Sequence, residues 1–332
     1  MSLGLRAGES ATRPVPLPRQ SGAAPRAAVP AVRPRRRRWR ATLHAYIALT
    51  KPRIIELLLV TTIPAMVLAA RGWPGWRLIL ATTLGGYLAA GGAGAINCYL
   101  DRDVDGLMVR TRRRPLVTGE VSARRALLFG IALGVAAFFE MWLWVNLLSA
   151  LLSMAALGFY VFVYTLWLKR STPQNIVIGG AAGAMPPVIG WAAVTGQLAW
   201  APVVMFLIVF VWTPPHFWAL ALRFQDDYER AHIPMLPVVR GERETLRQIV
   251  AYSAVLVLLS FLLLPTGTVG VVYGVSAAAL GGGFLLLAWR LHQQPGQRAA
   301  IGLFRFSISY LTLLFVAIAA DQIAQNLFGR LW

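Results

Sequence analysis

Long apolar stretches separated by short polar connections occupy most of the chain. Each stretch is close to the roughly 20 residues that an α-helix needs to cross a bilayer, so each predicts a transmembrane helix. The predicted spans cover residues 43–70, 78–100, 124–145, 147–168, 175–195, 200–223, 246–265, 268–290 and 300–325. The pattern therefore predicts an all-α polytopic membrane protein with nine transmembrane helices.

Basic residues are distributed unevenly among the connections. Four connections carry positive charge: seven arginines lie in 101–125, Lys-Arg at 169–170, five arginines in 223–247 and two in 290–298. The connections at 146, 195–197 and 265–267 hold neither Lys nor Arg. Because basic connections stay on the cytoplasmic side, we expect the N-terminus and the Arg-rich connections in the cytoplasm and the C-terminus outside.

Composition agrees with membrane insertion. Of the 332 residues, 57% are hydrophobic and 14% are charged, which excludes an ordinary soluble domain. The net charge of +19 comes almost entirely from arginine, since Lys51 and Lys169 are the only lysines. These cations lie between apolar spans, where they orient helices and attract anionic lipid or phosphate rather than nucleic acid. A single cysteine, Cys98, excludes an internal disulfide.

Residues 1–40 differ from the rest of the chain. They hold ten arginines among prolines and alanines, which is typical of a disordered basic tail bound to anionic lipid. A mitochondrial transit peptide would be amphipathic and Ser-rich, whereas this segment has prolines throughout and ends in the Arg35–Arg38 cluster. We therefore expect a cytoplasmic tail, 1–40, and a membrane domain, 41–328, in a bacterial inner membrane rather than a mitochondrial one.

The end of the second predicted span carries the first candidate site. Asn97, Asp101 and Asp105 are spaced by four residues, so on a helix their side chains form one column. Buried carboxylates need a cation nearby, and oxygen donors at a membrane boundary suit Mg²⁺ on a phosphorylated substrate. The alternative is a solvated loop whose acids offset the arginines that follow.

The sixth predicted span ends in a comparable cluster. His216, Arg223 and Asp227 share one face if the helix is continuous, and Pro214 and Pro215 are expected to break or kink the helix just before that face. A lone histidine in a membrane often only bonds neighbouring helices, which is the alternative for His216. Two four-helix pseudo-repeats plus a ninth helix would place both clusters on one face of the bundle.

Basic residues near these clusters have two interpretations. They are Lys51 and Arg53, which flank Pro52 at the cytoplasmic mouth of the first span, Arg110, Arg112, Arg113 and Arg114 after the first cluster, and Lys169 and Arg170 after the fourth span. Such basic residues commonly set the orientation of transmembrane helices. A guanidinium group can also donate two parallel hydrogen bonds to the oxygens of a phosphate. Acids, cations and an apolar cavity together suit Mg²⁺-assisted ionisation of an allylic diphosphate, so prenyl transfer is the favoured chemistry.

Several segments resemble the UbiA-type intramembrane prenyltransferases, whose N-x-x-x-D-x-x-x-D signature is similar to Asn97, Asp101 and Asp105. The resemblance covers residues 43–325 and is strongest to the branch of the family that farnesylates haem b. It rests on the runs 49–53, 97–105, 112–117, 164–170, 172–180, 212–220 and 227–238.

This resemblance implies transfer of the farnesyl group of farnesyl diphosphate, with addition of water, to a vinyl group of haem b. The product would be haem O, used by terminal oxidases directly or after conversion to haem A, so haem A synthase and oxidase assembly proteins are candidate partners. By resemblance, Asn97, Asp101, Asp105 and Asp227 hold Mg²⁺, and His216 contacts haem or delivers water. The substrate-binding set implied is Lys51, Arg53, Arg112, Arg113, Lys169, Arg223 and Tyr228.

Three other functions remain as alternatives. A prenyltransferase for a quinone precursor or another aromatic acceptor is the nearest, but the Trp-Thr-Pro-Pro-His-Phe run at 212–217 favours the haem branch. A secondary transporter would place its acids in mid-span, whereas these acids lie at helix ends. An oxidase assembly factor would need no ordered column of acids.

Overall fold

The computed structural model describes residues 35–329, and every regular element in that range is a helix. Eight helical segments are long and apolar enough to cross a membrane, and Leu59–Ala69 is a shorter apolar stretch. The prediction of an all-α polytopic membrane protein is confirmed. Residues 1–34 of the predicted tail lie outside the described residues, and the first helix begins within the rest of it.

Helices of very different lengths follow one another along the chain. They are α1 (Arg35–Thr50), α2 (Pro52–Ala69), α3 (Trp76–Leu100), α4 (Arg102–Asp105), α5 (Ala123–Trp144), α6 (Leu147–Gly158), the π-helix η1 (Phe159–Leu168), α7 (Lys169–Ser171), α8 (Asn175–Gly183), α9 (Pro186–Thr195), α10 (Trp200–Arg223), α11 (Gln225–Arg230), α12 (Leu236–Phe261), the 3₁₀ turn η2 (Leu264–Thr266), α13 (Val271–Gln293) and α14 (Gln297–Phe328).

Proline divides the first predicted span. The segment 43–70 is not one helix, because Lys51 adopts a left-handed conformation (φ 55°) between α1 and α2. Pro52 follows it, and a proline disfavours the helical conformation of the preceding residue. Pro214 and Pro215, by contrast, lie inside α10, so the helix is not broken there, while a kink at these prolines stays a prediction. The proline effect thus depends on the packing around each site.

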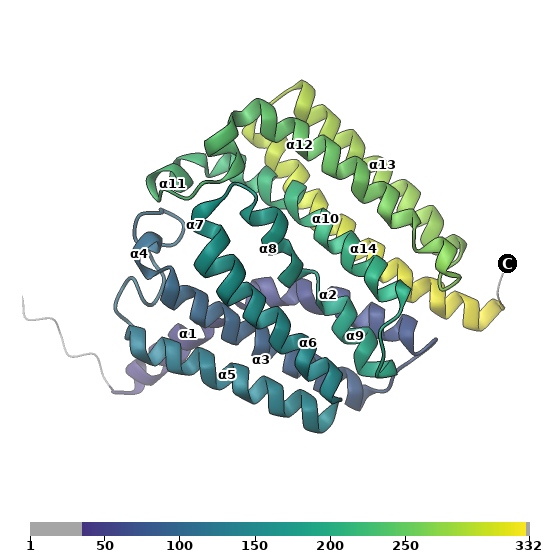
Figure 1. Ribbon diagram of the computed structural model, residues 1–332, viewed down its shortest axis with the longest axis horizontal. Helices are drawn as coiled ribbons and strands as arrows, with labels where there is room; N and C mark the ends of the chain where they lie inside the picture. Colours follow the sequence, from purple (N-terminus) through teal and green to yellow (C-terminus); the bar gives the residue numbers. More distant parts are fainter. Residues whose placement is uncertain (1–34, 330–332) are drawn as a thin grey trace, which may run out of the picture.

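The contacts between helices close into a ring, and Figure 1 shows these helices from the side. Successive long helices contact one another from α3 through α5, α6, α8, α10, α12 and α13 to α14. The last helix, α14, then returns to α2, and α2 contacts α3. The Asn326 side chain donates to the carbonyl oxygen of Arg71 at 2.9 Å, which ties the end of α14 to the α2–α3 turn. The helices α2 and α14 therefore close the bundle.

Glycine allows a close contact between the backbones of α3 and α5. A Cβ at Gly92 would lie 2.8 Å from the carbonyl oxygen of Gly130 and 3.1 Å from the amide nitrogen of Gly134. Small residues at membrane helix interfaces permit this approach of backbones. The second half of the bundle packs differently, with fully buried large side chains that include Tyr273, Phe284, Tyr310 and Phe315. The α3–α5 pair consequently holds the backbone that leads to the acidic residues.

Exposed tryptophans mark the two ends of the bundle. Trp39, Trp167 and Trp289 lie at the end that carries the Arg-rich connections. Trp73, Trp76, Trp142, Trp144 and Trp200 lie at the opposite end. Tryptophan is enriched at both membrane–water interfaces, so these two groups are consistent with a bilayer between them.

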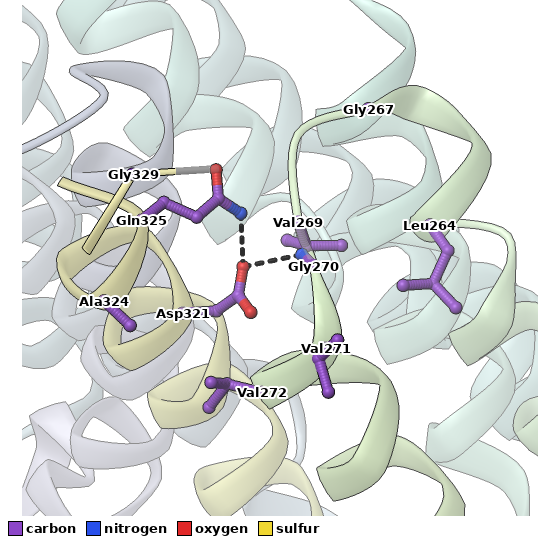
Figure 2. Close-up of a pocket in the computed structure, with 10 residues that line it drawn as sticks. All are labelled: Leu264, Gly267, Val269, Gly270, Val271, Val272, Asp321, Ala324, Gln325 and Gly329. Carbon is purple, nitrogen blue, oxygen red and sulfur yellow. Dashed lines mark hydrogen bonds between the residues drawn. The ribbon is translucent and has the colours of Figure 1, made fainter. Parts of the chain in front are cut away.

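A buried carboxylate organises the end opposite the Arg-rich connections (Figure 2). Asp321 of α14 accepts hydrogen bonds from the amides of Gly270 and Tyr273, at 2.7 and 3.1 Å, at the start of α13. Gln325 also donates to it, at 2.7 Å. Asp321, Gly270 and Gln325 border a cavity of about 250 Å³. The Asp321 carboxylate therefore accepts hydrogen bonds from amides at the start of α13 that have no partner within the helix. This is a structural role.

We predict that Gly92→Ala destabilises the protein. The added methyl group meets backbone atoms of α5 that cannot rotate away, so the helices must separate, at a cost of about 1–3 kcal/mol. The measurement is the thermal unfolding midpoint of the purified protein in detergent.

Gly86→Ala is the matched control on the same helix, because a Cβ there meets no atom within 4 Å. It should leave the midpoint unchanged or raise it slightly, since alanine is favoured over glycine in a helix. Equal midpoints for the two variants would contradict the close α3–α5 contact.

Candidate active site

The two acidic segments meet at one end of the bundle. Figure 1 shows the short helices α4, α7 and α11 together at this end, on the left of the view. The backbone amides of Val109 and Arg110, which follow α4, both donate to the carboxylate of Asp227 in α11, each at 3.3 Å. The prediction that both acidic clusters lie on one face of the bundle is therefore confirmed.

The column of Asn97, Asp101 and Asp105 forms as its spacing predicts. Although α3 ends at Leu100, the amide of Asp101 donates to the carbonyl of Asn97 at 2.9 Å, and the amide of Asp105 donates to that of Asp101 at 2.8 Å. Helical register thus continues into α4. The three side chains are 3%, 0% and 1% exposed, so the solvated-loop alternative is wrong.

Each member of the column has a cationic partner from a different segment. Lys51, at the α1–α2 junction, donates to Oδ1 of Asn97, and Lys169 of α7 donates to Oδ2 of Asp101. Arg114 donates to Oδ2 of Asp105 at 2.6 Å. Buried charges of this kind require such partners, and the contacts bring three cations together at the acids.

A fourth cation, Arg170, lies at the edge of the column. It forms an ion pair with the exposed Asp103, with Nη1 and Oδ2 2.7 Å apart. This side-chain hydrogen bond lowers the pKa of Asp103 to about 2. Arg170 also approaches Oδ1 of Asp101 at 3.7 Å, so it adds positive charge next to the column.

The amide of Asn97 has a defined orientation. Its Nδ2 donates to Oδ2 of Asp101 at 2.8 Å and to Oγ1 of Thr165 at 3.2 Å, which uses both amide hydrogens. Thr165 in turn donates to the carbonyl of Tyr160 at 2.8 Å, five residues earlier in the π-helix. The carbonyl oxygen Oδ1 of Asn97 consequently faces the Lys51 ammonium group. An oxygen in this orientation is also the atom that could coordinate a metal ion.

The column fits a hard cation. Oδ1 of Asp101 and Oδ1 of Asp105 are buried and have no hydrogen-bond partner among residues 35–329. Carboxylate and amide oxygens are the donors that Mg²⁺ prefers. Within the same range, no group of three or more His, Cys, Asp or Glu side chains is placed to hold a metal. The ligand set that fits is therefore the amide oxygen of Asn97 with the two carboxylates.

Asp227 lies on a different element from the one predicted. The helix α10 ends at Arg223, and Asp227 belongs to the separate helix α11, so His216, Arg223 and Asp227 do not share one continuous helix. Arg230 donates to Oδ1 of Asp227. Burial raises the pKa of Asp227, but the two amides and Arg230 outweigh it and hold the pKa below its usual value. Its place among the metal ligands stays a prediction.

His216 is buried between α10 and α14. Its ring stacks on Trp212, with centroids 4.2 Å apart, and on Phe304, at 4.6 Å. Its Nδ1 lies 2.7 Å from the hydroxyl of Ser307. These contacts are those of a residue that joins helices. The predicted catalytic role of His216 stays a prediction.

The other predicted substrate-binding residues differ in exposure. Arg112, Arg113 and Arg223 are exposed, and the Arg223 guanidinium lies 5.6 Å from the ring centroid of Phe224. Tyr228 is buried in the small apolar cluster beneath α11. The side chain of Arg53 lies outside what the structure describes.

Arg114 and Thr165 are functional candidates that the sequence interpretation did not select. Arg114 stands among four arginines, and nothing in the run distinguishes the one that reaches Asp105. Thr165 lies beside Tyr164 in a resembling segment, but its contact with Asn97 depends on the π-helix. The rings of Tyr160 and Tyr164, on the same π-helix, lie with their centroids 5.3 Å apart and tilted by 35°. The cavity near Asp321 is at the opposite end of the bundle and is separate from this chemistry.

Comparisons with solved structures support the same fold. A structure of digeranylgeranylglyceryl phosphate synthase in membranes has a TM-score of 0.71 and 17% identity, covering 85% of this chain and 99% of that one. A UbiA homolog from Archaeoglobus fulgidus bound to DMAPP and Mg²⁺ has a TM-score of 0.58 and 20% identity, covering 84% and 99%. At these identities, the likeness concerns the fold alone.

Sequence comparisons identify the family. A protein of Clavibacter sepedonicus named protoheme IX farnesyltransferase is 54% identical over 282 residues, covering 84% of this chain and 92% of its own length. The UbiA prenyltransferase family matches residues 58–314, which include the complete acidic column. The chain therefore belongs to the UbiA prenyltransferase family.

Proposed function

We propose that the protein transfers the farnesyl group of farnesyl diphosphate, with addition of water, to a vinyl group of haem b. The products are haem O and diphosphate. The observation that carries this proposal is 54% identity, over most of the chain, to a protein named protoheme IX farnesyltransferase. The buried acids and convergent cations supply the groups that a diphosphate substrate needs.

In this proposal Asn97, Asp101 and Asp105 hold Mg²⁺. The orientation of the Asn97 amide and the free oxygens of the two carboxylates support these three ligands. When bound, Mg²⁺ supplies positive charge against the departing diphosphate. The UbiA homolog from Archaeoglobus fulgidus was solved with Mg²⁺ and DMAPP, which agrees with such a site.

The cations around the column bind the diphosphate. Lys51, Lys169 and Arg114 already contact the three column residues, so a small side-chain movement brings each to an anion held there. Arg53, Arg112, Arg113, Arg223 and Tyr228 are the other proposed substrate contacts. Tyr160 and Tyr164 add an apolar surface beside the acids, suited to an isoprenoid chain and to keeping water from a carbocation.

We place the protein in the bacterial inner membrane, with the N-terminus in the cytoplasm and the C-terminus outside. The Arg-rich connections and the active site lie at the same end of the bundle. Haem b and farnesyl diphosphate then enter at the cytoplasmic end. Haem A synthase or oxidase assembly proteins would receive the product.

The direct test is an incubation of purified membranes with haem b, farnesyl diphosphate and Mg²⁺, followed by mass analysis of the extracted haems. We expect a haem heavier by one farnesyl group and one water, which is lost when Mg²⁺ is chelated. Unchanged haem b in membranes that contain folded protein would contradict the proposal. Turnover of a quinone precursor instead would assign the alternative acceptor.

Asp101→Asn should reduce haem O formation by about 100-fold or more, because a central charge of the site is lost. In the wild type, Lys169 donates a hydrogen bond to the Asp101 carboxylate. The asparagine amide of the variant can turn an N–H group toward this lysine instead of an oxygen. Asp103→Asn is the matched control, since Asp103 is exposed and pairs only with Arg170. Near-normal turnover by Asp101→Asn would refute the metal assignment.

Thr165→Val should lower kcat/KM by about tenfold, the effect of one hydrogen bond worth ~1.4 kcal/mol. The valine keeps the shape of the side chain but no longer accepts from Asn97, so the amide can turn its carbonyl away from the cation. The Mg²⁺ concentration for half-maximal activity should rise as well. Thr83→Val serves as the control, because Thr83 bonds only carbonyls of its own helix; the same loss in both variants would argue against an orienting role.

A further inference from the structure

The carboxylate of Asp227 is bound by two consecutive backbone amides. Val109 donates to Oδ1 and Arg110 donates to Oδ2, each at 3.3 Å, across a sequence separation of more than 100 residues. Arg230 of the same short helix also donates to Oδ1. Both oxygens of this carboxylate are thus engaged, whereas Asp101 and Asp105 each keep one oxygen without a hydrogen bond within the described range.

Two successive amides that point at one anion form a small anion-binding concavity. In this chain the anion is the chain's own carboxylate, and hydrogen bonds to a charged acceptor are stronger than those between neutral groups. The contact therefore holds the backbone of the segment between α4 and α5 at residues 109 and 110.

That segment carries the arginines of the site. Immediately after the held amides, the hydroxyl of Thr111 donates to the carbonyl of Asp105 at 2.8 Å, and Arg114 reaches the Asp105 carboxylate at 2.6 Å. Arg112 and Arg113 lie between these two contacts and are exposed. A displacement at residues 109–110 would therefore shift Arg112, Arg113 and Arg114 relative to the acidic column.

Apolar packing holds the underside of the same segment. Val104 and Met108 are buried in one cluster with Ala221 of α10, Tyr228 of α11 and Ile233. The Arg110 guanidinium lies 5.9 Å from the ring centroid of Phe224, between α10 and α11. Asp227 adds hydrogen bonds to an interface whose buried part consists of apolar and aromatic side chains.

We propose that Asp227 is a positioning residue that anchors the Arg-bearing segment 106–122 over the active site, rather than a ligand of Mg²⁺. This inference rests on the proposed function for the identity of the substrate. Oδ1 of Asp227 accepts from Val109 and Arg230 and Oδ2 accepts from Arg110, so a metal would have to share a carboxylate whose charge these three donors already stabilise. As an anchor, Asp227 acts on farnesyl diphosphate through Arg112, Arg113 and Arg114.

The test compares Asp227→Asn with Asp226→Asn. An asparagine at 227 accepts from one amide but presents an N–H group to the other, whereas Asp226 is exposed. We expect amide hydrogen exchange in the peptide containing Val109 and Arg110 to be about tenfold faster in Asp227→Asn, the equivalent of one lost hydrogen bond. Asp226→Asn should exchange at the wild-type rate.

Kinetics separate an anchor from a ligand. For Asp227→Asn we expect the KM for farnesyl diphosphate to rise about tenfold, with kcat and the Mg²⁺ concentration for half-maximal activity within about twofold of wild type. A raised Mg²⁺ requirement with unchanged exchange at 109–110 would overturn the proposal and make Asp227 a ligand.

Wild-type protein provides a measurement that does not depend on the folding of a variant. Addition of Mg²⁺ alone should leave the exchange of Val109 and Arg110 unchanged, and faster exchange would show that the carboxylate leaves them for the metal. Exchange requires no turnover. If wild type makes no haem O, the proposed function fails while the exchange result still decides whether Asp227 is an anchor.

Discussion

Burial of two carboxylates at the end of a membrane helix is the constraint on which the site depends. Asp101 and Asp105 are almost inaccessible to solvent, and an unpaired charge in that position would be strongly unfavourable. Their partners come from the segment after α4, from α7 and, through Asn97, from the α1–α2 junction. Neutralising the acids therefore requires that segments far apart in the sequence come together.

The surrounding fold supports these contacts through backbone geometry. Close α3–α5 packing at Gly92 holds the helix from which the column extends. The break before Pro52 places Lys51 at a helix junction, in a conformation that a continuous helix could not provide. The π-helix brings Thr165 to the amide of Asn97, and such helices are frequently found at functional sites.

The sequence predicts the membrane spans and the column well, because both depend on regular spacing. Hydrophobic length identifies spans, and a separation of four residues places Asn97, Asp101 and Asp105 on one face. The contacts of Asp227 could not be predicted, since backbone amides such as those of Val109 and Arg110 carry no residue signature. Nor does the composition of an arginine run reveal that Arg114, rather than Arg112 or Arg113, reaches Asp105. The continuity of α10 through Pro214 and Pro215 likewise depends on neighbours that local sequence does not specify.

The asparagine at the head of the column has an electrostatic consequence. Because Asn97 is neutral, the column carries two negative charges, and Lys51, Lys169 and Arg114 face them with three positive ones. The resting site therefore has a surplus of positive charge. Opposite charge in a cleft raises the local concentration of an ionic ligand and speeds its arrival. The diphosphate group of farnesyl diphosphate would thus be attracted to this end of the bundle before its hydrocarbon chain enters the apolar interior.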